Sequence, residues 1–270
     1  MKSIKGEIAL VTGGASGIGR LLALSLAESG ARVLAWDIDE AALRRLEAEA
    51  VSRGLEIAGM VCDVSRREEV YAKAKEALER FGPVGILVNN AGVVSGKSLL
   101  ETSDEKIEKT MAVNALASFW TVKAFLPAML VRGAGHIVTV SSAAGIVGVT
   151  GLADYSASKF AAFGFNEALR MELRKNRSPV KTLIVCPFFV DTGLFEGVKS
   201  KVPLLLPILK QEYVAKRIAL AIRKGKKRLV LPFFVYSVWL LRLLPVGFMD
   251  AVADLFGISS TMDHFTGRGK

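Results

Sequence analysis

The chain has 270 residues, of which 51% are hydrophobic and 23% charged, and its formal net charge is +10. Only two cysteines occur, which excludes a disulfide-rich scaffold, and we expect Cys62 and Cys186 to pack as small apolar residues in a reducing compartment. The two histidines, His136 and His264, have no partners at metal-ligand spacing, so we predict no metal site. No internal repeat, low-complexity tract or Pro- or Ser-rich linker divides the chain.

A phosphate-binding turn is predicted near the amino terminus. The segment EIALVTGGASGIGRLLALSLAESG reads as an apolar strand, a glycine-rich turn and an amphipathic helix. Gly13, Gly17 and Gly19 would let the backbone approach a pyrophosphate at the helix N-terminus. Because the motif begins at residue 12, no room is left for a cleavable signal peptide before the first strand, and we expect a cytoplasmic protein.

The second predicted strand, ARVLAWD, ends at Asp37, eighteen residues after Gly19. A carboxylate there would accept hydrogen bonds from the adenosine ribose hydroxyls and repel a 2′-phosphate. Ser16 in the turn and Ile38 after the strand are uncharged, so no cation beside them offers a phosphate its counter-ion. The sequence therefore favours NAD over NADP. Asp37 could instead cap the next helix, and the two roles are compatible.

Three residues in the second half have the spacing of a hydride-transfer site. Tyr155 and Lys159, in YSASK, share one face of a predicted helix, and Ser142 ends the run HIVTVSS thirteen residues before the tyrosine. We predict that the Lys159 ammonium lowers the pKa of Tyr155, so that the phenol acts as acid or base. Ser142 is expected to bind the reacting oxygen.

The stretch REEVYAKAKEALERFG repeats the same spacing at Tyr71 and Lys75. Thirteen residues before Tyr71 stands Ala58, which has no hydroxyl, and no strand ending in serine precedes this helix. We therefore interpret Tyr71 and Lys75 as an ordinary solvated helix face.

Further motifs are CDV (Cys62–Val64), NNAG (Asn89–Gly92), MAVNALASFW and VCPFFVDT. With TGGASGIG and YSASK, they give a chain that resembles the short-chain dehydrogenase/reductase family over about residues 4 to 230. The alternating strands and helices agree with the fold that this resemblance implies, an α/β protein with a single doubly wound parallel sheet, or Rossmann fold, and helices on both faces.

The resemblance also implies roles for individual residues. Asp63 would contact the adenine amine, Asn90 and Ala91 would line the cofactor, and Thr192 would hold the nicotinamide carboxamide. Asn114 would join Lys159 through water in a proton relay. The cofactor contacts predicted in addition are Ser16, Ile18, Val64, Pro187 and Val190, together with Tyr155 and Lys159.

The stretches NNAGVVSGKSLLE, FWTVKAFLPAML, HIVTVSS and VCPFFVDTGLF are most similar to the retinol dehydrogenase and 17β-hydroxysteroid dehydrogenase type 11 subgroup. Phe188 stands where the family usually has glycine, a replacement that this subgroup shares, and its ring would narrow the space beside the nicotinamide. The resemblance implies an NAD(H)-dependent oxidoreductase for a lipophilic alcohol and its ketone or aldehyde, of retinoid, steroid or long-chain type. The alternatives are a 3-oxoacyl reductase of lipid synthesis and a non-catalytic dinucleotide-sensing scaffold.

The excess of positive charge lies in the second half of the chain. Residues 1–135 hold seventeen basic and seventeen acidic side chains, whereas residues 136–270 hold nineteen and nine. Between Lys199 and Arg228, ten basic residues face only Glu212. Because no nucleic-acid motif or aromatic interleaving accompanies this basic cluster, we expect no nucleic-acid partner, and an anionic membrane surface fits better.

Residues 231–270 are predicted to form an apolar helical extension of a catalytic domain at residues 1–230. The uncharged run Leu229–Leu241 spans thirteen residues, fewer than the roughly twenty of a membrane-spanning helix, and contains Pro232. The extension is either a peripheral membrane anchor, a lid over the pocket or a subunit interface, and one segment could combine these roles. Helices predicted at about 104–131 and 153–176 could pair copies of the chain in a homodimer or homotetramer.

Overall fold

Short runs of buried apolar residues form a parallel sheet in the computed structural model, which describes residues 4–267. The first of them, IALVT, is buried along its whole length, as expected for a strand covered on both faces. The strands of the main sheet are β1 (Ile8–Thr12), β2 (Arg32–Asp37), β3 (Ile57–Val61), β4 (Ile86–Asn89), β5 (His136–Val140), β6 (Lys181–Pro187) and β9 (Arg228–Leu231). A separate parallel pair consists of β7 (Val190–Asp191) and β8 (Leu209–Lys210).

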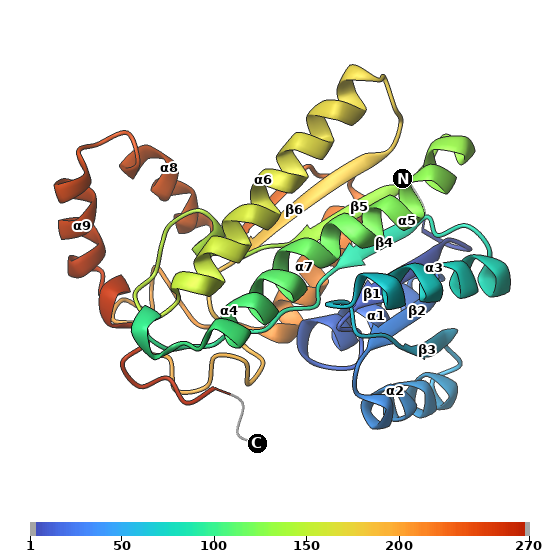
Figure 1. The fold of residues 1–270 in the computed structure, drawn as a ribbon, viewed down its shortest axis with the longest axis horizontal. Helices are drawn as coiled ribbons and strands as arrows, with labels where there is room; N and C mark the ends of the chain where they lie inside the picture. Colours follow the sequence, from blue (N-terminus) through green and yellow to red (C-terminus); the bar gives the residue numbers. More distant parts are fainter. Residues whose placement is uncertain (1–3, 268–270) are drawn as a thin grey trace.

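The strand order is β3-β2-β1-β4-β5-β6-β9, and all neighbours pair in parallel (Figure 1). The order changes direction between β1 and β4, which makes the carboxyl ends of these two strands the topological switch point of the sheet. Ligands of open α/β sheets bind at such a point. The predicted doubly wound parallel sheet is confirmed.

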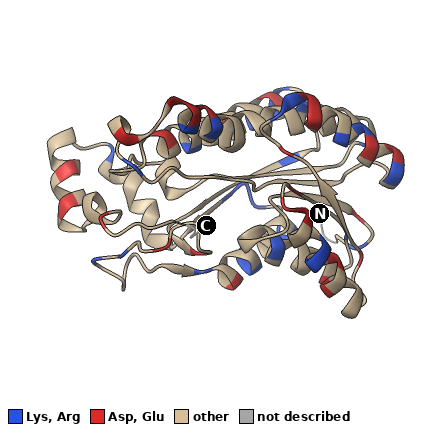
Figure 2. Ribbon diagram, turned by 60° about the horizontal axis from the view of Figure 1, so that its bottom comes forward, with Lys and Arg blue, Asp and Glu red and all other residues tan. Residues whose placement is uncertain are grey.

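Helices cover both faces of the sheet, and most of the charged residues lie on them (Figure 2). One hydrophobic core joins the sheet to α1 (Gly17–Glu28), α2 (Glu40–Ser52) and α7 (Gln211–Arg223). A second core, on the opposite face, contains residues of α3 (Arg67–Phe81), α5 (Ala117–Arg132) and α6 (Ala153–Lys175). Each helix therefore buries one apolar side against the sheet and exposes the other.

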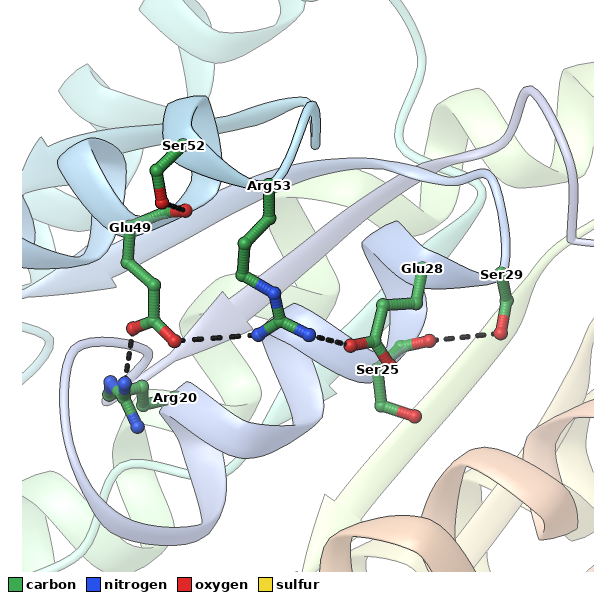
Figure 3. A network of polar contacts seen from close by, with 7 residues as sticks. All are labelled: Arg20, Ser25, Glu28, Ser29, Glu49, Ser52 and Arg53. Atoms are coloured by element: carbon green, nitrogen blue, oxygen red, sulfur yellow. Dashed lines mark hydrogen bonds and ion pairs between the residues drawn. The ribbon is translucent and has the colours of Figure 1, made fainter.

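Ion pairs join α1 to α2 at the surface (Figure 3). Arg53 lies between Glu49 and Glu28, and Arg20 contacts the other carboxylate oxygen of Glu49. All four side chains are partly exposed, so each pair contributes at most about 1 kcal/mol, and the buried apolar face of each helix contributes more.

A short π-helical segment, Ala112–Leu116, lies between α4 (Asp104–Met111) and α5. Within the described residues, the continuous helix Asp104–Arg132 is the one that is long and apolar enough to cross a membrane, and half of its most apolar window is buried inside the fold. The π-segment holds Asn114 on its buried side. Such local changes of helix type frequently mark functional sites.

The carboxy-terminal extension begins as the last sheet strand ends. Strand β9 continues to Leu231, one residue beyond the predicted boundary at residue 230, and that division of the chain stays a prediction. Two short helices follow, α8 (Ser237–Leu241) and α9 (Val246–Leu255), which lie together at the left of Figure 1.

Candidate active site

The turn between β1 and α1 is rich in glycine. Gly13 and Gly17 have φ angles of +61° and +52°, in the region that favours glycine. A Cβ atom on Gly19 would lie 1.9 Å from the carbonyl oxygen of Gly13 and 2.6 Å from Nδ2 of Asn90. The conformation therefore favours glycine at two positions of the turn, and packing leaves no room for a side chain at Gly19, while binding of a pyrophosphate there stays a prediction.

Thr12 connects the ends of β1 and β4 at the switch point. Its Oγ1 accepts hydrogen bonds from the backbone N–H groups of Asn90 (3.0 Å) and Ala91 (3.1 Å). The Asn90 amide in turn donates to the carbonyl oxygens of Thr12 (3.0 Å) and Gly13 (3.2 Å). Asn90 thus holds the backbone of the glycine turn in place. Thr12 is a structural residue of the site that we did not predict, although its hydroxyl directly before the first glycine of the motif could have indicated it.

Asp37 lies at the end of β2 and turns its carboxylate toward the glycine turn. Oδ2 accepts from the backbone N–H of Ala15 (3.0 Å), and Oδ1 accepts from that of Asp39 (3.2 Å). The helix cap is Asp39, whose carboxylate accepts from Ala42 N–H (2.9 Å). The alternative role of Asp37 as a helix cap is therefore wrong, because α2 begins only at Glu40.

Asp63 and Val64 follow β3, beside the end of β2. The Asp63 carboxylate accepts from the backbone N–H (2.9 Å) and the hydroxyl (2.6 Å) of Ser65. Burial raises the pKa of this carboxyl, but the hydrogen bonds from Ser65 and the charge of Lys109 outweigh it, and the net pKa is lowered. Asp63 is therefore an anionic acceptor at neutral pH.

Tyr155, Lys159 and Ser142 come together between β5 and α6. The Lys159 ammonium is buried, donates to the carbonyl of Val140 (3.0 Å) and lies 5.5 Å from the centroid of the Tyr155 ring. The Ser142 hydroxyl accepts from the Ala144 N–H (3.1 Å), donates to the Pro187 carbonyl (3.5 Å) and lies close enough to Tyr155 to lower its pKa. The predicted proximity of phenol, ammonium and hydroxyl is present in the structure.

The electrostatics of these groups differ from the sequence prediction. Burial raises the pKa of Tyr155 to about 12, and the hydrogen bond with Ser142 opposes this only in part. Burial also lowers the pKa of Lys159 to about 8. The expectation that Lys159 brings the pKa of Tyr155 below its usual value is wrong for this structure, because Lys159 points its charge at the Val140 carbonyl and desolvation dominates.

Asn114 is a buried residue of the π-helical segment. Its amide exchanges two hydrogen bonds with the backbone of Val93, at 2.8 and 2.9 Å, and donates to the hydroxyl of Ser158 (3.0 Å). A Cβ atom on Gly92 would stand 3.4 Å from both Asn114 Oδ1 and Lys159 Nζ. Gly92 therefore lies beside both polar groups, within ordinary contact distance of each. The relay role of Asn114 stays a prediction.

One pocket collects most of the predicted site residues. Its lining includes Gly13, Ser16, Gly17, Ile18, Asn90, Ala91, Ser142, Tyr155, Lys159, Pro187, Val190 and Thr192. The predicted residues Gly19, Asp37, Asp63, Val64 and Asn114 are absent from this lining: Gly19 packs beneath the turn, Asp37, Asp63 and Val64 follow strands at its side, and Asn114 lies behind Gly92.

The far part of the same pocket is apolar. Phe188 and Phe189 from the end of β6 contribute to it, as does Leu206. Helices α8 and α9 contribute Val238, Leu241, Met249, Val252 and Ala253 to the lining, and Phe256, directly after α9, contributes as well. Sequence reasoning identified the extension as a candidate lid but did not identify these side chains, since their inward orientation depends on the tertiary fold.

Other candidate groups take no part in this site. Tyr71 is exposed, and Lys75 pairs with Glu79 at 3.9 Å on the surface of α3, as expected for a solvated face. Burial raises the pKa of the Cys62 and Cys186 thiols to about 12, so neither is activated as a nucleophile. Within residues 4–267, no three His, Cys, Asp or Glu side chains are grouped as metal ligands.

Comparisons with known proteins agree with this geometry. Residues 7–203 match the family model described as short chain dehydrogenase. Epidermal retinol dehydrogenase 2 of Mus musculus is 45% identical over 272 residues, which covers 100% of this chain and 88% of that protein. Both matches include the strands, turns and helix that carry the site. The chain belongs to the short-chain dehydrogenase family, a class of oxidoreductases, and the resemblance to retinol dehydrogenases is confirmed.

Solved structures show the same fold. A short-chain dehydrogenase/reductase from Burkholderia phymatum in complex with NAD is 31% identical, with a TM-score of 0.81 over 90% of this chain and 95% of that one. A metagenomic short-chain oxidoreductase in complex with NADP is also 31% identical, with a TM-score of 0.70 over 84% and 95% of the two chains. Because one of these structures holds NAD and the other NADP, the fold alone does not determine which dinucleotide is bound. The residues around the adenosine site determine it.

Proposed function

We propose that this protein is an NAD(H)-dependent oxidoreductase that interconverts a lipophilic alcohol and its ketone or aldehyde. The observation that carries the proposal is one pocket with two unlike ends. One end holds the glycine turn with Ser142, Tyr155 and Lys159, and the other is formed by aromatic and aliphatic side chains. The hydroxyl or carbonyl group of a substrate would lie at the polar end, and its long apolar part would pack against the aromatic and aliphatic side chains.

The cofactor end fits NAD. The glycine turn would supply backbone for the pyrophosphate, and Asp37 would supply an acceptor for the ribose hydroxyls; among residues 4–267, no basic side chain is hydrogen-bonded to it. Thr192, Pro187 and Val190 line the part of the pocket beside Tyr155, where the nicotinamide would lie. When bound there, NAD would supply the hydride acceptor, and NADH the donor.

The chain's own residues would handle the proton. Ser142 would hold the reacting oxygen beside the Tyr155 hydroxyl by a hydrogen bond. With its pKa near 12, Tyr155 is protonated at neutral pH and ready to donate to a carbonyl oxygen. In the direction of alcohol oxidation, the phenolate would need stabilisation, which a hydrogen bond from Ser142 is placed to provide. A water held between Lys159 and Asn114, which both lie beside Gly92, would connect them in a proton relay.

A screen of alcohols and ketones of graded chain length, each with both dinucleotides, tests the proposal. We expect kcat/KM to rise with chain length and to be higher with NAD(H) than with NADP(H). Retinoids, steroids and long-chain alcohols belong in the screen because the mouse relative is a retinol dehydrogenase by name. A preference for short, polar alcohols would contradict the proposed substrate class.

The alternative functions make different predictions in the same screen. A 3-oxoacyl reductase would turn over 3-oxoacyl thioesters faster than free ketones. Apart from Lys159, however, no Lys or Arg lines the described pocket to bind a charged carrier. A dinucleotide-sensing scaffold would bind NADH without turnover, and the complete set of Ser142, Tyr155 and Lys159 argues against it.

We also propose that the extension attaches peripherally to a membrane. The outer surface of α8, α9 and the turn between them exposes apolar side chains, among them Leu240 (70% exposed) and Leu243 (82%), while the inner surface lines the pocket. Four basic residues at the end of α7, Arg223, Lys224, Lys226 and Lys227, are exposed. The apolar outer surface of α8 and α9 and the apolar lining beneath it support a combined anchor and lid, through which an apolar substrate would pass from the bilayer into the site.

Association of two or four copies is the remaining proposal. Helix α5 and its preceding π-segment expose Leu116, Leu130 and Val131, and α6 exposes Met171. These apolar side chains lie on the two long helices predicted to pair copies of the chain. Sedimentation of the purified protein in detergent-free buffer would give its mass in solution, and a monomer at micromolar concentration would contradict this proposal.

A further inference from the structure

The ring of Tyr155 has one aromatic neighbour among the described contacts. Phe195 meets it edge-on, with ring centroids 5.4 Å apart and an interplanar angle of 84°. Such an edge-to-face pair restricts how a ring can tilt. Lys159, the charged group that faces the ring, lies 5.5 Å from its centroid. Phe195 is therefore an aromatic contact that restrains the Tyr155 ring.

Phe195 itself belongs to no strand or helix. It lies in an irregular stretch that follows β7, so backbone hydrogen bonds of a regular element do not hold it. Two rings support it instead: Phe189 with centroids 5.1 Å apart and Phe265 with centroids 6.5 Å apart. Phe189 follows strand β6, whereas Phe265 lies seventy residues further along the chain than Phe195.

The end of the described chain, Thr261–Gly267, crosses this stretch as a strap, which we call the C-terminal strap. The N–H groups of Thr266 (2.9 Å) and Gly267 (3.3 Å) donate to the carbonyl of Glu196, directly after Phe195. A Cβ atom on Gly197 would lie only 2.0 Å from the carbonyl oxygen of His264. The strap therefore packs closely on the backbone that carries Phe195.

Phe265 also touches the other side of the site. A Cβ atom on Gly96 would stand 1.8 Å from Cε1 of the Phe265 ring, so the ring rests on bare backbone there. The preceding residue, Ser95, donates to the buried carboxylate of Asp154 at 2.7 Å. Asp154 directly precedes Tyr155 in α6. Phe265 is therefore connected to Tyr155 in two ways: through the ring of Phe195, and through the Gly96 backbone and the hydrogen bond from Ser95 to Asp154.

We propose that Phe265 is a positioning residue for Tyr155, acting through Phe195, and that the C-terminal strap is part of the active site. This inference rests on the proposed function and adds a determinant from the end of the chain. Removing the Phe265 ring would leave Phe195 without its outer support and open a path for water to the phenol. Misplacement of a reacting group by even about 1 Å is costly in rate.

The test uses the full-length protein with Phe265→Ala, Phe265→Leu and, as a matched control, Phe81→Ala. Phe81 is also partly buried but lies at the end of α3, and its described ring contact is Arg80. We expect Phe265→Ala to lower kcat about tenfold with a smaller change in KM, and Phe265→Leu to retain most of the activity because it keeps apolar volume. Phe81→Ala should leave kcat unchanged.

A second readout is independent of turnover. Ultraviolet titration of the tyrosines, with Tyr155→Phe subtracted in each background, reports the pKa of Tyr155, which burial raises to about 12. Phe265→Ala should lower this pKa toward the ordinary value, since water would reach the phenol. If the parent turned over no alcohol or ketone, the proposed function would fail, yet this titration would still test the positioning.

A double variant decides whether Phe265 acts through Phe195. The loss in kcat for Phe195→Ala combined with Phe265→Ala should be no larger than for Phe195→Ala alone, because the two residues act in series. Additive losses would overturn the proposed connection. Unchanged kcat and an unchanged Tyr155 titration in Phe265→Ala would overturn the positioning role itself.

Discussion

The two ends of the pocket are built in different ways. The cofactor end is made by the ends of regular strands, which Thr12, Asn90 and Asp37 join through hydrogen bonds to backbone atoms. The substrate end is made by irregular stretches and two short helices, which aromatic and aliphatic contacts hold together. Hydrogen bonds fix groups at defined distances and directions, whereas apolar contacts tolerate exchange of side chains.

The positions of the hydrogen-bonded groups at the cofactor end are therefore fixed by the fold, whereas the apolar side chains at the substrate end can be exchanged. Ser142 follows β5, and Tyr155 and Lys159 lie on α6, where the two ends of the pocket meet. Both kinds of contact occur here: Ser141 donates to the Lys159 carbonyl (2.8 Å), and Phe195 packs on Tyr155. Changes at the cofactor end should therefore affect chemistry with every substrate. Changes at the substrate end should affect long substrates more than short ones.

The sharpest test of the boundary is Tyr155→Phe. We expect kcat to fall by at least about a hundredfold with all substrates, because general acid/base catalysis contributes that much, while NADH binding persists. The matched control is Tyr71→Phe, which removes the same hydroxyl from the exposed pair on α3. Retained activity in Tyr155→Phe together with loss in Tyr71→Phe would mean that the site is misassigned.

Asp37→Ala tests the cofactor end. The carboxylate would accept hydrogen bonds from the ribose and repel a 2′-phosphate, so its removal should weaken NAD binding about thirtyfold and narrow the gap between NAD and NADP. Asp39→Ala, which removes the α2 cap, is the control and should lower thermal stability without changing the dinucleotide preference. A parent enzyme whose kcat/KM is higher with NADP would refute the assignment.

Sequence reasoning predicted the cofactor end well because its signals are local. A strand, a glycine turn and a helix follow one another within the first thirty residues, and positive φ angles at Gly13 and Gly17 are what glycine there indicates. The YSASK spacing likewise places Tyr155 and Lys159 on one helix face without knowledge of the rest of the fold.

The substrate end was less predictable because its contacts join distant residues. Nothing near Phe195 in the sequence indicates that Phe265 lies against it, and nothing near Gly96 indicates a ring on its backbone. The pKa of Tyr155 was predicted in the wrong direction for a related reason. The spacing to Lys159 is visible in the sequence, but the desolvation that dominates comes from the tertiary burial of both groups.

The double variant Leu240→Ser with Leu243→Ser tests the outer surface of the substrate end. We expect the fraction bound to anionic liposomes at low salt to fall about tenfold, because partial burial of two leucines contributes on the order of 1 to 2 kcal/mol. Val51→Ser, at 77% exposure in α2 and away from the extension (Figure 1), is the control and should bind as the parent does. Activity toward short alcohols should persist in both.

Salt dependence separates the two contributions to membrane binding. Rising ionic strength should release part of the bound parent protein, since it screens the basic residues after α7, while the apolar contact resists salt. If the parent stayed in the supernatant at every salt concentration, the anchor proposal would fail and the extension would be a lid or an interface alone.

The smallest expected effect concerns His136, which starts β5 at the amino edge of the sheet, away from both ends of the pocket. Burial lowers its pKa from 6.5 to about 4, and neither ring nitrogen has a hydrogen-bond partner within the described chain. His136 of the unfolded chain is protonated near pH 6.5, whereas in the folded protein it stays neutral until about pH 4. Stability is therefore lost as the pH falls from 6.5 toward 4. The first pH unit of this fall should lower the free energy of unfolding by about 1 kcal/mol, or roughly fivefold in the unfolding equilibrium.

Urea unfolding at several pH values should show a smaller dependence of stability on pH in His136→Leu. Ile137→Val, a buried neighbour without a titrating group, should shift stability equally at every pH. An unchanged slope in His136→Leu would assign the acid sensitivity to the carboxylates instead.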